Sequence, residues 1–80
     1  MFNREVLKLI QNDGVESDLP LSRIDNDTVI YSKSIDSKLN VGDVIKKDWQ
    51  DGQASLYKVL NFKIMNKLEK TLVINVQKIN

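Results

Sequence analysis

The chain has 80 residues, with 12 basic and 11 acidic side chains and neither cysteine nor histidine. The lack of cysteine excludes disulfides and thiolate metal sites, and the lack of histidine removes the commonest general base and transition-metal ligand. A domain of this size gains only about 3 to 5 kcal/mol from its core, so oligomerisation is the stabiliser left to consider. No apolar run approaches the roughly 20 residues of a membrane helix, and the N-terminus lacks a signal-peptide hydrophobic region. We therefore expect one domain over residues 1–80, neither transmembrane nor secreted by a signal peptide.

The first stretch, MFNREVLKLIQNDG, predicts a short helix over residues 1–13. Asn3 is a suitable N-cap, and Gly14 can supply the left-handed residue that ends a helix. The apolar side chains recur at helical spacing, which favours packing of this face on the chain's own sheet over docking on a partner. The face consists of Phe2, Val6, Leu9 and Ile10.

Residues 21–80 have the pattern of a small antiparallel β-barrel or curved sheet of four to five strands, so the fold class is mainly β (α+β) with an N-terminal helix. Pro20 cannot donate a ladder hydrogen bond and is expected at an edge or a strand entry. Asn26 and Asp27 predict a turn that leads into a strand at residues 28–32, and Gly42 and Asp43 lead into the next.

The last two strands are predicted to form a hairpin with a loop at residues 67–69. Three apolar pairs then fall on one side, so we expect this face to be the stability centre, where Phe62→Ala costs roughly 3 to 5 kcal/mol. The pairs are Ile64 with Leu72, Phe62 with Ile74, and Leu60 with Val76.

Residues 39–62, LNVGDVIKKDWQDGQASLYKVLNF, predict a hairpin whose Asp51-Gly52 pair forms a two-residue turn. Trp49 beside this turn is either a lid on the barrel end or an interface anchor, since it has an apolar body and a polar tip. We take the anchor as the hypothesis. The predicted partner-binding residues are Lys47, Trp49, Asp51, Gly52 and Tyr57.

Charge is distributed unevenly: residues 1–45 carry five basic and eight acidic side chains, and residues 46–80 carry seven and three. Such asymmetry suits head-to-tail docking of subunits in a ring, although scattered solvated charges would give the same count. Lys58 and Lys63 with Tyr57 raise a nucleic-acid alternative, which the pI near 7.9 disfavours; edge lysines that prevent strand aggregation are the favoured explanation of the cations.

Catalytic patterns are lacking in the sequence. The Asp-rich stretches at residues 13–18 and 25–28 do not have calcium-loop spacing and are explained as turns. No Gly-rich phosphate loop is present, and no carboxylate pair is placed for acid–base work. We therefore expect no enzyme activity, no metal, no cofactor and no small-molecule substrate.

A motif in the second half resembles the core of small β-barrel head-tail connector proteins of tailed phages, of the head-closure or stopper group, over residues 39–80. It consists of Gly42, Asp43, Val44 and Ile45, then Gly52, Tyr57 and Val59, followed by a strand, a turn and a last strand. The resemblance implies a structural subunit of the virion that works as a ring with other virion proteins. The alternatives are a nucleic-acid-binding barrel and a small mobile-element inhibitor of a host protein; outside a virion the expected location is the cytoplasm.

Overall fold

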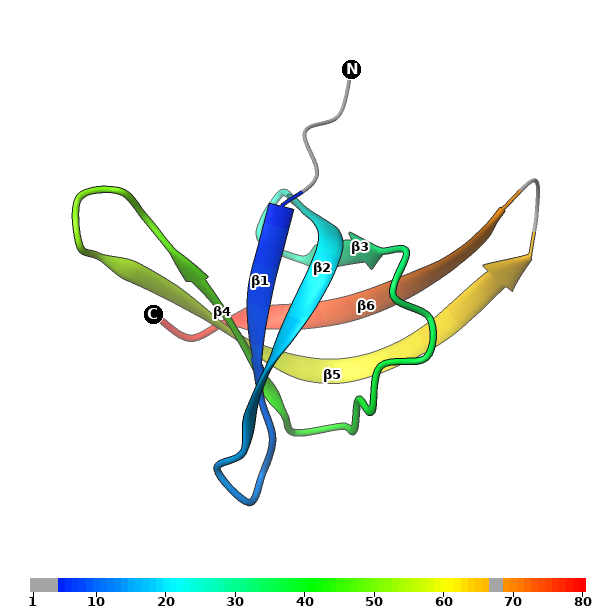
Figure 1. Ribbon diagram of the computed structural model, residues 1–80, viewed down its shortest axis with the longest axis horizontal. Coiled ribbons are helices and arrows are strands. Elements are labelled where there is room, and N and C mark those ends of the chain that lie inside the picture. The colour runs from blue at the N-terminus through cyan, green and yellow to red at the C-terminus, as the bar shows by residue number, and fades with distance from the viewer. Residues whose placement is uncertain (1–4, 67–68) are drawn as a thin grey trace.

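The computed structural model describes residues 5–66 and 69–80, and it folds them into a closed barrel of six strands without a helix (Figure 1). The strands are β1 (Glu5–Ile10), β2 (Glu16–Asp25), β3 (Val29–Ser32), β4 (Val44–Asp48), β5 (Ala54–Asn66) and β6 (Lys70–Lys78). Their order around the barrel is β1-β2-β3-β6-β5-β4, and every neighbouring pair is antiparallel. The predicted antiparallel barrel is confirmed, with six strands in place of four or five. The described residues include no helix long and apolar enough to cross a membrane.

The predicted helix over residues 1–13 is wrong, because this segment supplies β1. Side chains alternate along a strand, so Leu7 and Leu9 point into the barrel and are buried, while Val6 points outward and is exposed. Pairing with β2 on one side and β4 on the other outweighs the local helical spacing of the apolar residues. The predicted cap and the first residue of the predicted face, Asn3 and Phe2, lie outside the described residues.

Gly14 lies in the turn between β1 and β2, not at the end of a helix. The turn is closed by two backbone hydrogen bonds, from Gln11 N to Val15 O at 2.9 Å and from Gly14 N to Gln11 O at 2.8 Å. Asp13 supports it by accepting a bond from Val15 N at 3.1 Å. Gly14 has a φ of +88°, which a residue without a Cβ adopts at little cost.

Pro20 lies inside β2, at an irregularity in the pairing with β1. Leu21, the next residue, has a φ of +53°, and the strand bends there to pair with β3. Three serine hydroxyls lie within hydrogen-bond distance of Pro20 O, at 3.1 Å for Ser22, 3.2 Å for Ser32 and 2.9 Å for Ser34, and the Ser22 hydroxyl also lies 3.0 Å from Leu19 O. Two of these serines are fully buried, so the hydroxyls satisfy a carbonyl that the bend withdraws from the ladder.

The predicted turn at Asn26 and Asp27 is confirmed, with φ values of +53° and +59° and a bond from Thr28 N to Asp25 O at 3.1 Å. Positive φ at both central residues is the geometry of a two-residue hairpin turn, which Asn and Asp tolerate well. The turn places the Asp27 carboxylate beside the end of the barrel, next to β5.

The predicted register of the β5–β6 hairpin is confirmed for two of three pairs, Phe62 with Ile74 and Ile64 with Leu72. The third is wrong, because a bulge at Leu60 shifts the register and Val76 pairs with Val59. The predicted buried face is therefore only half right. The β6 residues Leu72, Ile74 and Val76 are buried, but the β5 residues Leu60, Phe62 and Ile64 remain 45%, 38% and 45% exposed.

These β5 residues are exposed because the hairpin extends past the strands that flank it. β4 pairs with β5 only as far as Lys58, and β3 pairs with β6 only as far as Leu72. Pairing between β5 and β6 continues to Asn66 and Lys70. We call residues 61–66 and 70–71 the arm; Figure 1 shows it projecting at the right of the barrel.

The core inside the barrel draws on all six strands and on the connection between β3 and β4. Its members share near-complete burial and close mutual packing, and Ile24 and Ile35 lie against them. They are Leu7, Leu9, Leu19, Ile30, Leu39, Ile45, Tyr57, Val59, Leu72, Ile74 and Val76.

Candidate protein-contact site at the β4–β5 turn

The β4–β5 turn has the same backbone as the β1–β2 turn. Trp49 N donates to Gln53 O at 2.8 Å, Gly52 N donates to Trp49 O at 3.1 Å, and Gln53 N donates to the Asp51 side chain at 3.0 Å. Only Gly52 has a positive φ, +88°, so the expected two-residue turn is in fact a three-residue loop over residues 50–52. The loop fixes the position of Trp49 at the end of β4.

Trp49 is held on two sides, although the residue is still 47% exposed. Its Nε1 donates to Ser55 Oγ at 2.9 Å, and Ser55 is itself buried at the end of the barrel. Lys47 Nζ lies 4.3 Å from the centroid of the indole, within the range of a cation–π contact. The indole therefore rests against the barrel end in one orientation and presents the rest of its surface to solvent.

Lys47 is oriented by a second partner, Glu5, at the start of β1. Lys47 Nζ donates to Glu5 Oε2 at 2.8 Å, and the two side chains are only 20% and 35% exposed. A half-buried ion pair with a short, direct hydrogen bond is screened less by salt than one in open solvent. Glu5 thus holds the ammonium that lies over the Trp49 ring.

Tyr57 lies next to this group but is buried, with 1% of its surface exposed. Its hydroxyl donates to Asp27 Oδ1 at 2.7 Å. Burial, and then the hydrogen bond and negative charge of Asp27, raise the pKa of Tyr57 to about 12. The phenol therefore stays protonated and bound to Asp27, and it ties the β2–β3 turn to β5.

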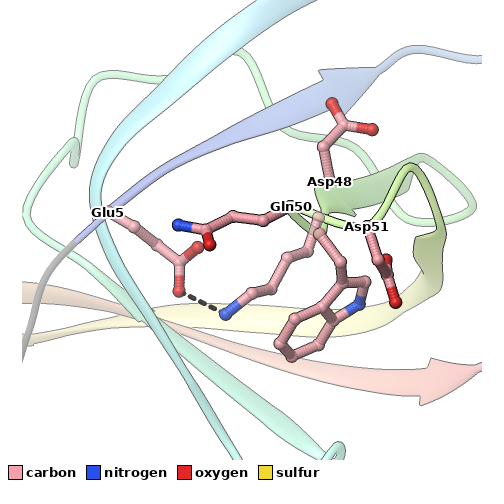
Figure 2. Close-up of a pocket in the computed structure, with 6 residues that line it drawn as sticks. Glu5, Asp48, Gln50 and Asp51 are labelled. Carbon is pink, nitrogen blue, oxygen red and sulfur yellow. Dashed lines mark hydrogen bonds and ion pairs between the residues drawn. The ribbon is translucent and has the colours of Figure 1, made fainter.

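Trp49, Lys47 and Glu5 line the larger of two adjoining cavities, about 530 Å³ in volume, which we call the Trp49 cavity. Figure 2 shows the Gln50 amide beside the Glu5 ion pair, with Asp48 and Asp51 farther from that pair. Its lining residues are Glu5, Lys47, Asp48, Trp49, Gln50 and Asp51. Three carboxylates and one ammonium give this lining a net charge of −2. An indole beside excess negative charge favours a cationic side chain of a binding partner.

A second cavity of about 280 Å³ shares Lys47 and Trp49 with the first and reaches Tyr57 and Asp27. Four of the predicted partner-binding residues, Lys47, Trp49, Asp51 and Tyr57, thus line one continuous region, and Gly52 shapes its turn. Tyr57 contributes a buried wall and no exposed ring. Whether this region contacts a partner stays a prediction.

The predicted site residues did not include Asp48, Gln50 and Ser55, which lie in or beside the predicted turn, or Glu5 and Asp27, which lie far from it in the sequence. The predicted helix contains Glu5, and a helix does not place its carboxylate opposite Lys47, 42 positions away. Asp27 was explained as a turn residue, which it is, but the same turn also directs its carboxylate at Tyr57. Strand alternation could have indicated Glu5, because it shares the inward face with Leu7 and Leu9.

The lysines of the nucleic-acid alternative, Lys58 and Lys63, are exposed on the outward side of β5. Tyr57, the ring assigned to that alternative, is buried with its hydroxyl engaged, so it offers no face on which a base could stack. The three residues do not form one surface.

Within residues 5–66 and 69–80, no three carboxylate, cysteine or histidine side chains cluster so as to hold a metal ion. Comparisons with protein-family models, curated proteins and solved structures give no match to this chain.

Proposed function

We propose that this protein is a non-enzymatic structural subunit that acts through protein contacts, and that the Trp49 cavity is one of its contact sites. The observation that carries the proposal is a half-exposed indole fixed by Ser55 and Lys47. A preorganised aromatic side chain loses little conformational entropy when a partner covers it, and such residues dominate many interfaces. The excess of carboxylates favours a partner that presents lysine or arginine.

The biological setting that we propose is a tailed-phage virion, with the protein as a head-tail connector component that assembles as a ring. The motif from Gly42 to Val59 supports this setting, and so does the need of a small, disulfide-free chain for stabilising contacts. No catalytic residue, cofactor or small-molecule substrate forms part of the proposal.

Trp49 is the only tryptophan in the chain, so its fluorescence reports directly on the site. The probes are a short lysine- and leucine-containing peptide and a single-stranded oligonucleotide of similar length. We expect the peptide to shift the emission to shorter wavelength, and Asp51→Asn to weaken this effect severalfold through loss of one carboxylate. The matched control is Asp36→Asn, an exposed aspartate in the β3–β4 connection.

The competing nucleic-acid reading predicts the reverse result. A shift produced by the oligonucleotide, lost steeply as salt is added, together with no response to the peptide, would overturn the proposed contact site.

A further inference from the structure

The arm combines an open strand edge with exposed apolar side chains. Its β5 segment pairs only with β6 among the described strands, so one edge of the ladder is open. The apolar side chains of Phe62 and Ile64 lie on one face of that segment and remain 38% and 45% exposed, and Leu60, at the bulge just before the arm, is 45% exposed. An open edge with an apolar face is the kind of surface that proteins cover with another chain.

The arm is also cationic. Lys63 and Lys70 are exposed, and neither has an acidic partner within the described residues. The acidic side chain nearby in the sequence, Glu69, is bound to Lys33 at 2.9 Å. The arm therefore offers two uncompensated ammonium groups.

The Trp49 cavity has the complementary charge. Lys47 partly compensates Glu5, and Lys46 lies 3.5 Å from Asp48, but the Asp51 carboxylate accepts only the backbone bond from Gln53 and has no cationic partner in the described chain. Asp51 is exposed at the tip of the turn. The exposed part of the Trp49 ring lies beside it as an apolar surface.

The arm and the Trp49 cavity lie at opposite ends of the molecule. In Figure 1 the β4–β5 turn is at the left and the arm at the right, along the longest axis, whose extent is 36 Å. An arm therefore cannot reach the cavity of its own chain, but the arm of a second copy can. A head-to-tail contact joins two different surfaces of neighbouring copies, and the arm and the Trp49 cavity are two such surfaces at opposite ends.

We propose that the partner of the Trp49 cavity is the arm of a second copy of this chain. Phe62 and Ile64 of the arm would lie near Trp49, and the arm lysines near Asp48 and Asp51. This inference rests on the proposed function, because it names the occupant of the same site. It gives the edge lysines a binding role beyond the prevention of strand aggregation.

Charge reversal at each end tests the contact without touching the core. The cavity variant carries Asp48→Lys and Asp51→Lys, the arm variant carries Lys63→Glu and Lys70→Glu, and all four side chains are exposed. Analytical ultracentrifugation over a series of concentrations measures self-association, and circular dichroism confirms that each variant folds. Lys38→Glu, in the β3–β4 connection, is the control.

We expect the wild type and Lys38→Glu to self-associate, and each double variant alone to associate at least about tenfold more weakly, because its two ends now carry the same charge. Mixing the two double variants should restore association, since each arm then meets a cavity of opposite charge. Added salt should weaken the wild-type contact.

Three results overturn the inference. A wild type that stays monomeric at every concentration has no such contact, and an arm variant that associates normally does not use its arm. Failure of the mixture to associate rules out a head-to-tail contact. The proposed contact site fails separately, if the lysine peptide leaves Trp49 emission unchanged; a peptide that binds while the protein stays monomeric leaves the site standing with another partner.

Discussion

Alanine at Phe62 and alanine at Ile74 should have very different effects on stability, although the two residues face each other across the β5–β6 ladder. Ile74 is fully buried in the barrel, whereas Phe62 is 38% exposed at the base of the arm. Ile74→Ala removes buried methyl groups and leaves a cavity, at a cost of about 2 to 5 kcal/mol, close to the whole stability of about 3 to 5 kcal/mol expected here.

Phe62→Ala should cost much less than its position in the ladder suggests. Full burial of a phenylalanine side chain is worth about 1.5 to 3 kcal/mol. Because more than a third of Phe62 is exposed and its site opens to solvent, we expect a loss of about 1 to 2 kcal/mol and no enclosed cavity. This replaces the larger loss expected from the sequence.

Urea unfolding followed by far-ultraviolet circular dichroism, at protein concentrations too low for association, measures both losses. Ile74→Val, with an expected loss of about 0.5 to 1.5 kcal/mol, keeps the buried position measurable if Ile74→Ala does not fold. Equal losses for Phe62→Ala and Ile74→Ala under these conditions would show that the inner face of the arm is buried in the monomer, and the argument for an exposed arm would fail.

Gly52→Ala and Gly14→Ala should each lower the free energy of unfolding by about 1 to 2 kcal/mol, since both φ values are +88° and an added Cβ would meet no neighbour in either turn; unequal losses would show that the two turns differ in solution. Tyr57→Phe should cost about 0.5 to 1.5 kcal/mol at neutral pH by removing the bond to Asp27. Because folding raises the pKa of Tyr57 from 10.0 to about 12, the wild type should lose stability between these pH values relative to Tyr57→Phe, and parallel pH profiles would contradict this. Asp43→Ala should cost roughly 1.5 to 3 kcal/mol, measured by urea unfolding, because the buried carboxylate accepts backbone N–H bonds from two loops; a neutral effect would show that water replaces it.

The two Asp-Gly turns show how much of the local structure can be predicted from the local sequence. Residues 11–15 and residues 49–53 form the same hydrogen-bonded loop, closed by the same aspartate and glycine contacts. Alternating strands flank the second loop and predict a hairpin, whereas the apolar residues before the first loop also fit a helical period and predict a helix end. A stretch as short as β1 satisfies both periods, and only pairing with β2 and β4 decides between them.

The sequence by itself determined the β-rich barrel, the positions of the turns at Asn26 and Gly52, and most of the register of the last hairpin, since these depend on side-chain alternation and on residues that tolerate positive φ. The tertiary structure alone decided which apolar residues are buried. Phe62 and Ile74 both occupy apolar positions on the same face of the β5–β6 ladder. The strands that flank them end at different points, so Ile74 is covered and Phe62 is partly exposed. The structure also decided the site, because the contact between Glu5 and Lys47 joins two strands that become neighbours only when the barrel closes.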